Sequence, residues 1–109
     1  MTNNIKNNYV YIITNFGRTV LYTGVTNDLT RRIAEHYENR GNYKTFAGKY
    51  HCYNVIYYEC FNHIQTAIAR EKEIKHLNRS EKNVLIASFN KEWKSLNSEF
   101  MDDWPPPCK

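Results

Sequence analysis

The sequence lacks the features that mark secreted and membrane proteins. No apolar run approaches the roughly 20 residues that a membrane helix needs. The polar start, MTNNIKNN, has no apolar segment of the kind found in a signal peptide. The three cysteines, Cys52, Cys60 and Cys108, form no CxxC pair, and an odd number without a leader argues against a disulfide framework. We therefore expect a soluble cytoplasmic protein that does not associate with membranes.

The excess of charge is also small. Fifteen Lys and Arg against eleven Asp and Glu give a net charge of +4 and a pI near 9.0, which favours polyanionic partners but is common among proteins that bind none. A chain of 109 residues can bury one modest core and has no room for a second. We expect one domain over 9–96, between a flexible N-terminus, 1–8, and a flexible proline-rich tail, 97–109.

Residue patterns predict an α/β (α+β) fold, a small three-stranded antiparallel sheet flanked by about three helices. The strands are YVYIIT from Tyr9, TVLYTGV from Thr19 and VIYYEC from Val55, rich in aromatic and β-branched residues. The turn NFGR joins the first two strands as a hairpin. Apolar spacing predicts helices over 29–38, from 63 to about 77 and over 80–89, the last with Ser80 as N-cap and with Val84, Leu85 and Ile86 in the core.

The junction between the second strand and the first helix gathers groups that suit a phosphate. The strand contains Gly24 near its end, Thr26, Asn27 and Asp28 suit a helix cap, and the helix carries Arg31, Arg32 and His36. Helical spacing places Arg32 and His36 at the border of the face that packs on the sheet, whereas Arg31 points elsewhere. Structural explanations also fit these residues. Arg32 could pair with an acid such as Glu71, and His36 could be a hydrogen-bonded histidine at the rim.

Glu71 lies in an unexpected place on the second long helix. It shares a stripe with four apolar residues, Ile64, Ala67, Ile68 and Ile74. Removing a lone carboxylate from water costs several kcal/mol unless a cation compensates. That cation is either Lys75, at i+4, or a hard divalent ion such as Mg²⁺ or Mn²⁺.

The stretch from 39 to 54 mixes basic and aromatic residues without a period, which predicts a loop with a short helical turn. Its cations interleave with rings, a combination suited to phosphate contact and to stacking on bases or sugars. The alternative is a long loop pinned to the core by its rings, with solvated lysines. The residues concerned are Arg40, Tyr43, Lys44, Phe46, Lys49 and Tyr50.

Four short stretches, taken in order, resemble the GIY-YIG nucleases. YVY (9–11) and YTG (22–24), with the turn between them, are similar to the paired triads that name this family, with Tyr9, Val10 and Thr23 as departures from those triads. DLTRRIAEH resembles the family's helix that bears an arginine and a histidine, and AIAREKEIKHL its helix that bears a glutamate. The resemblance covers 9–96, which we expect to be a catalytic domain like that of the small stand-alone members.

The resemblance implies a set of site residues. Tyr11, Tyr22, Arg32, His36 and Glu71 fall on catalytic positions, Gly24 on a structural one, and Glu71 on the ligand of one Mg²⁺ or Mn²⁺. By resemblance Tyr11 is the general base and Tyr22 and His36 position it, although the residues themselves leave His36 open as the base. Ordinary strand aromatics remain the alternative for Tyr11 and Tyr22. Nucleic-acid contacts are expected from Arg31, Arg40, Lys44 and Lys49.

The function implied is that of a metal-dependent endonuclease. It would hydrolyse phosphodiester bonds in DNA, including branched or damaged DNA, during repair, recombination or restriction. A chain this short would rely on its own loop, a protein partner or self-association for targeting. Two other classes stay open: a nucleic-acid-binding module of the same fold without turnover, and an interaction protein in which Glu71 and Arg32 pair inside a closed core.

Overall fold

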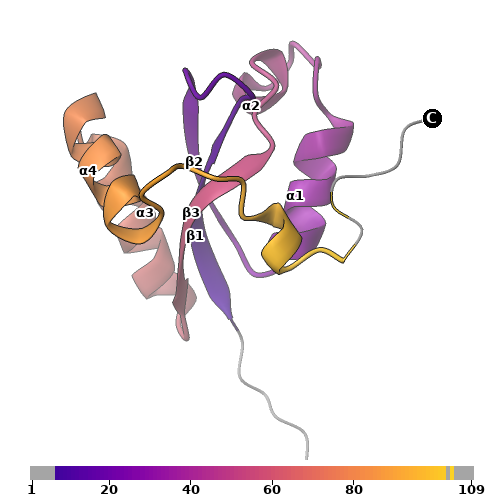
Figure 1. Cartoon of the computed structure of the whole chain (residues 1–109). Coiled ribbons are helices and arrows are strands. Elements are labelled where there is room, and N and C mark those ends of the chain that lie inside the picture. The colour runs from indigo at the N-terminus through magenta and orange to yellow at the C-terminus, as the bar shows by residue number, and fades with distance from the viewer. Residues whose placement is uncertain (1–6, 103, 105–109) are drawn as a thin grey trace, which may run out of the picture.

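An antiparallel sheet of three strands forms the centre of the fold (Figure 1). β1 (Asn8–Thr14) lies between β2 (Leu21–Thr26) and β3 (Asn54–Phe61), and it pairs antiparallel with both. The computed structural model describes residues 7–102 and 104. The predicted sheet and its first hairpin are confirmed, and the middle strand is the one most completely buried.

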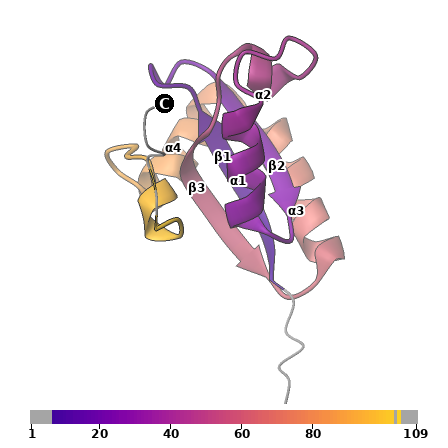
Figure 2. The same cartoon turned by 90° about the vertical axis from the view of Figure 1, so that its right-hand side faces the viewer.

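Helices cover both faces of the sheet (Figure 2). α1 (Leu29–Glu38) and the short α2 (Phe46–Lys49) lie on one face with the 3-10 turn η1 (Asn97–Glu99). α3 (Ile64–His76) and α4 (Arg79–Phe89) lie on the other. α1 has the predicted bounds, and the Asp28 side chain caps it by accepting a hydrogen bond from the backbone N–H of Arg31.

Alternate residues of β1 enter two separate cores because successive side chains of a strand point to opposite faces. The core on the α1 side contains Tyr11, Ile13, Leu29, Ile33, Ala47, Cys52, Val55 and Leu96. The core on the α3 and α4 side contains Val10, Ile12, Ile56, Tyr57, Ala67, Ile74 and Ile86. None of the helices in the described part of the chain is long and apolar enough to cross a membrane.

α4 begins earlier than its sequence predicted. Its N-cap is Asn78, not Ser80, because the Asn78 side chain accepts from the N–H of Glu81 while the Glu81 carboxylate accepts from the N–H of Asn78, each at 2.8 Å. This reciprocal pair satisfies two backbone donors where a serine cap satisfies one. The prediction that Val84 enters the core is also wrong, since Val84 is 71% exposed and Ile86 alone of the helix is fully buried.

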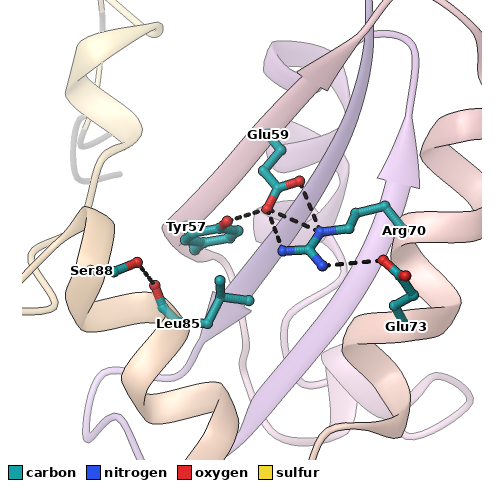
Figure 3. Close-up of polar contacts among 6 residues, drawn as sticks. All are labelled: Tyr57, Glu59, Arg70, Glu73, Leu85 and Ser88. Carbon is teal, nitrogen blue, oxygen red and sulfur yellow. Dashed lines mark hydrogen bonds and ion pairs between the residues drawn. The ribbon is translucent and has the colours of Figure 1, made fainter.

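The buried stripe of α3 is narrower than predicted. Ala67 and Ile74 are completely buried, but Ile64 and Ile68 are 41% and 37% exposed. A network on β3 and α3 fixes this helix against the sheet (Figure 3). Arg70 donates to both carboxylate oxygens of Glu59, which also accepts from the Tyr57 hydroxyl, and Arg70 pairs with Glu73 on its own helix.

Chain segments at both ends pack onto the domain beyond 9–96. Asn8 is part of β1 and its side chain donates to the carbonyl of Phe61. Asn97 is completely buried: its side-chain oxygen accepts from the N–H of Val55 and its amide donates to the carbonyl of Tyr53, both at 2.9 Å. Residues 100 and 101 pack on the α1-side core and the Trp104 ring meets Tyr37, so packing contacts extend into the stretch expected to be a flexible tail. The predictions for residues 1–6, 103 and 105–109 lie outside the described residues.

Candidate active site

Tyr11 and Gly24 are direct partners across the two N-terminal strands, and their pairing aims the Tyr11 ring. The ring lies against Gly24 so closely that a Cβ at position 24 would fall 2.4 Å from its hydroxyl oxygen. Gly24 is therefore glycine because the phenol fills the space that a side chain would occupy. The ring passes over β2, the edge strand, and brings its hydroxyl toward that edge of the sheet.

His36 meets the Tyr11 hydroxyl from the last turn of α1. Its Nε2 atom lies 2.9 Å from the Tyr11 oxygen in a buried hydrogen bond, and the two residues are only 6% and 1% exposed. Burial and, to a smaller extent, the charge of Arg32 lower the pKa of His36 to about 4, so the imidazole is neutral at neutral pH. Burial raises the pKa of Tyr11 to about 12, so its phenol stays protonated. The buried pair is thus uncharged.

Tyr22 completes an aromatic cluster around the imidazole. Its ring meets the His36 ring edge-on with centroids 5.6 Å apart. The other side of Tyr22 stacks on Phe46 of α2 at 6.3 Å. Sequence reasoning did not connect Phe46 with Tyr22, because only the path of the 39–54 loop brings α2 back over β2.

Arg32 lies one turn before His36 on α1 and is partly exposed. Its guanidinium pairs with Glu35 at 3.0 Å, an ion pair open to solvent that holds the arginine weakly. Its charge lowers the pKa of Tyr11 and also that of His36, which places it beside the buried pair. The alternative pairing of Arg32 with Glu71 is not found. Its actual partner, Glu35, follows from i, i+3 spacing that the sequence already contained.

Glu71 reaches the same region from α3, which packs against β1 and β2. Its side chain is 15% exposed and pairs with Lys75 at 3.3 Å, the structural partner expected from i+4 spacing. The Glu71 charge raises the pKa of Tyr11, the smallest of the effects on that phenol, so the carboxylate lies within electrostatic range of it. The two tyrosines and His36 are in contact, and the charges of Arg32 and Glu71 both act on the Tyr11 phenol. We therefore take five predicted residues as the candidate site at the β2 edge: Tyr11, Tyr22, Arg32, His36 and Glu71.

A divalent ion at this site would have one carboxylate from the protein. Within residues 7–102 and 104, no three His, Cys, Asp or Glu side chains cluster as a metal site. That excludes a closed structural site of the zinc type in this region but fits Mg²⁺ or Mn²⁺, which keep several waters and take phosphate oxygens as ligands. Lys75 is half exposed, so it can turn into solvent and free Glu71.

The four cations expected to contact nucleic acid are spread along the surface. Arg31 is exposed and faces Asp28 at 3.8 Å. Arg40 lies over the Tyr37 ring at 3.8 Å, and Lys49 lies 5.3 Å from the centroid of Tyr50. Lys44 is exposed in the loop before α2. None of them joins the five residues at the β2 edge through a hydrogen bond or ion pair found in the described residues.

Two other features do not contribute to the site. Asn90 is the C-cap of α4, and its amide donates to the carbonyls of Ile56 and Lys94. A surface hollow of about 480 Å³ lies near the start of α1, lined by residues that include Tyr9, Tyr58 and Phe100. None of the five residues lines it.

Comparison with known proteins identifies the family. The GIY-YIG catalytic domain model matches residues 7–83. A UPF0213 protein of Streptococcus pyogenes serotype M3 is 35% identical over 95 residues, covering 83% of this chain and 96% of the relative. A UPF0213 protein of Haloquadratum walsbyi is 36% identical over 77 residues, covering 71% of this chain and 83% of the relative.

A solved structure agrees with these sequence matches. The solution NMR structure of the UPF0213 protein of Bacillus halodurans has a TM-score of 0.52 and 29% identity, and the match covers 84% of this chain and 95% of that one. The predicted α+β fold is thus confirmed by a relative of nearly the same extent. The chain belongs to the GIY-YIG catalytic domain family, among its small UPF0213 members.

Proposed function

We propose that this protein is a divalent-metal-dependent endonuclease that hydrolyses phosphodiester bonds in DNA. One observation carries the proposal: a buried Tyr11–His36 pair lies within the electrostatic reach of both a partly exposed arginine and a carboxylate on a separate helix. Membership of a nuclease family supports it. An ordinary core would require neither charge beside a buried phenol.

Arg32 would hold the scissile phosphate. Its present partner, Glu35, is 43% exposed, so the exchange of that carboxylate for the monoanion of a phosphodiester costs little. A guanidinium offers two parallel N–H donors that match phosphate oxygens and offset the charge that grows on them in the transition state. Its position one turn from His36 would set that phosphate beside the tyrosines.

Tyr11 would act as its phenolate: the phenol would first release its own proton to solvent, and the phenolate oxygen, held in direction by His36, would then accept a proton from the attacking water. At a pKa of about 12 almost all of the phenol is protonated, and two charges act on it in opposite directions: Arg32 lowers the pKa and Glu71 raises it. A divalent ion on Glu71 would cancel the unfavourable charge, polarise the phosphate and lower the pKa of water and phenol. His36 is already neutral and serves as the hydrogen-bond partner throughout.

The biological setting belongs to the same proposal. We place the protein in the cytoplasm, acting in repair, recombination or restriction on DNA that can be branched or damaged. Cys52 and Cys60 are both free thiols, which suits a reducing compartment. A protein partner or a second copy would supply targeting that a single small domain does not.

The test is cleavage of a panel of labelled DNA substrates, with Mg²⁺, with Mn²⁺ and with EDTA. We expect cutting that needs the metal and that falls at least about 100-fold in Arg32→Ala, the loss typical of one group that stabilises transition-state charge. Arg79→Ala is the matched control, since Arg79 is an exposed arginine at the start of α4, on the opposite face of the sheet. Its rate should equal that of the wild type.

The outcome separates nuclease from binding module. A folded wild-type protein that binds DNA with a steep salt dependence but cuts no DNA or RNA in either metal would favour the module without turnover. Equal rates for Arg32→Ala and the wild type would remove the arginine from the mechanism.

A further inference from the structure

We propose that the loop platform, residues 39–53, binds unpaired nucleotides of a DNA strand by stacking, so that the preferred substrate is single-stranded DNA. This proposal names a substrate class for the proposed nuclease, and the expected preference for cleaving single strands rests on that proposed function. The binding of single strands does not rest on it, because binding requires neither a metal ion nor a reaction.

A continuous series of aromatic rings links the platform to the candidate active site. From the Tyr11–His36 hydrogen bond, ring contacts run outward through Tyr22 to Phe46 and on to Tyr50. The centroid distances along this series are 5.6 Å, 6.3 Å and 4.9 Å. A base stacked on Phe46 would therefore lie next to Tyr22, and its phosphate would lie within a nucleotide of the site.

The outer rings of the series are open to solvent. Phe46 is 51% exposed, Tyr50 is 39% exposed and Tyr43, in the same loop, is 81% exposed. Three exposed rings within eight positions are costly for a surface that binds nothing, since each leaves apolar area in water. A protein partner could also cover such rings, so the charge around them decides the occupant.

The platform carries only positive charge. Arg40, Lys44 and Lys49 lie between positions 39 and 53, and the same stretch contains no Asp or Glu. Lys49 lies 5.3 Å from the centroid of Tyr50, so a cation flanks one of the stacking rings. Rings and cations in alternation match a strand that alternates bases and phosphates.

The platform is held in place before any ligand arrives. The Thr45 side chain caps α2 by accepting from the N–H of Gly48, and the Gly41 N–H donates to the Gly48 carbonyl at 2.8 Å. Ala47 and Cys52 anchor the segment in the α1-side core. A Cβ at position 48 would meet the Asn42 carbonyl at 2.6 Å, so the tight path needs glycine there. Little ordering cost remains for binding.

Single-stranded DNA suits this surface better than duplex. In a duplex the faces of the bases are covered by their neighbours, whereas an unpaired base can turn either face to a ring. Stacking is also tolerant of sequence, because every base has a flat face. We therefore expect a preference for strand state rather than for sequence.

Fluorescence anisotropy with a labelled DNA strand of about 16 nucleotides, in EDTA, tests the proposal. We expect the strand to bind at least about tenfold more tightly than its duplex, and Phe46→Ala to weaken strand binding about tenfold. Tyr43→Ala, a change at an 81% exposed ring, should also weaken strand binding. Phe46→Trp should keep the affinity.

The matched control is Phe89→Ala. Phe89 is 51% exposed, as Phe46 is, and contacts two tyrosine rings, but it belongs to α4 on the opposite face of the sheet. Its removal should leave strand binding unchanged. Equal affinity for strand and duplex, equal losses in Phe46→Ala and Phe89→Ala, or tighter binding of an RNA strand of the same sequence would each overturn the proposal.

The two proposals can fail separately. Strand-selective binding that depends on Phe46, without cleavage in any metal, would keep the platform and reject the nuclease. Metal-dependent cleavage that proceeds equally on duplex and single strand, with no effect of Phe46→Ala, would keep the nuclease and reject the platform.

Discussion

Gly24 and Tyr11 share a space that holds only one side chain, since a Cβ on Gly24 would lie 2.6 Å from the ring carbon that bears the Tyr11 hydroxyl. The clash is with a rigid, buried ring rather than with the end of a flexible chain. The identity of residue 24 therefore controls where the phenol points and whether it reaches His36.

Gly24→Ala should displace the Tyr11 ring and lower the free energy of unfolding by about 1–3 kcal/mol, the usual cost of overpacking a core. Urea denaturation measures this loss. Gly17→Ala is the control, because the nearest atom to a Cβ at position 17 is 3.9 Å away. In a Tyr11→Ala background the cost of Gly24→Ala should largely vanish. A cost that is unchanged there would show that the two residues do not compete for space.

His36 should make the protein less stable in mild acid. Its native pKa of about 4 lies below the ordinary 6.5, so between these values the unfolded chain binds a proton that the native chain does not. Stability is therefore unaffected by this group above pH 6.5 and falls as the pH drops from 6.5 to 4, by on the order of 3 kcal/mol.

Urea denaturation across this pH range checks the prediction by comparing the wild type with His36→Gln. The stability difference between them should narrow toward pH 4, since the variant has no imidazole to protonate. His63→Gln, a change at an exposed histidine, should leave the wild-type pH dependence as it is. Parallel curves for wild type and His36→Gln would contradict the account.

Arg70 should matter more for stability than its partial exposure suggests. It neutralises Glu59, whose side chain is 22% exposed. The ion pair between Arg70 on α3 and Glu59 on β3 also holds the helix against the strand (Figure 3). Arg70→Met leaves that carboxylate without its cation and should cost about 1–3 kcal/mol in thermal or urea unfolding. Glu73→Gln removes the 67% exposed partner of the same arginine and should cost under about 0.5 kcal/mol. Equal effects would show that Glu59 does not need Arg70.

Asn97 should anchor the C-terminal segment to the sheet. Asn97→Ala removes a buried hydrogen bond from the Val55 N–H and a partly buried one to the Tyr53 carbonyl, and should cost about 2–3 kcal/mol. Ser98→Ala, at the exposed neighbouring position, is the control. Hydrogen exchange at the Val55 amide reads the loss directly, and an unchanged exchange rate in Asn97→Ala would contradict the anchor.

Local signals were enough to predict most of the fold. The hairpin and α1 depend on the periodic spacing of apolar residues and on capping residues a few positions away, and both can be read directly from the sequence. The predicted N-cap of α4 was wrong although a cap is also a local feature. Ser80 is a suitable cap by residue type, but Asn78 and Glu81 form a reciprocal pair of hydrogen bonds that starts the helix earlier. The packing of Asn97 could not be predicted for another reason: it forms a hydrogen bond with a residue 42 positions away, and no periodic pattern in the sequence encodes such a contact.

The candidate site divides in the same way. Tyr11, Tyr22, Arg32, His36 and Glu71 could be named from motif resemblance. In the structure the two tyrosines contact His36, and the charges of Arg32 and Glu71 act on the Tyr11 phenol. The contacts of these residues could be known only from the structure. Arg32 pairs with Glu35 and not with Glu71, and the path of the 39–54 loop brings Phe46 against Tyr22. The catalytic roles themselves stay predictions until activity is measured.

The central claim is that Glu71 supports metal-dependent hydrolysis at this site, and single-turnover cleavage of labelled single-stranded DNA tests it most directly. The wild type and Glu73→Gln, a change at an exposed acid two positions along the same helix, should cut at equal rates in Mg²⁺ and not at all in EDTA. Glu71→Gln should fold normally, by its unchanged circular dichroism, and cut at least about 100-fold more slowly. Cleavage by Glu71→Gln at the wild-type rate would contradict the account.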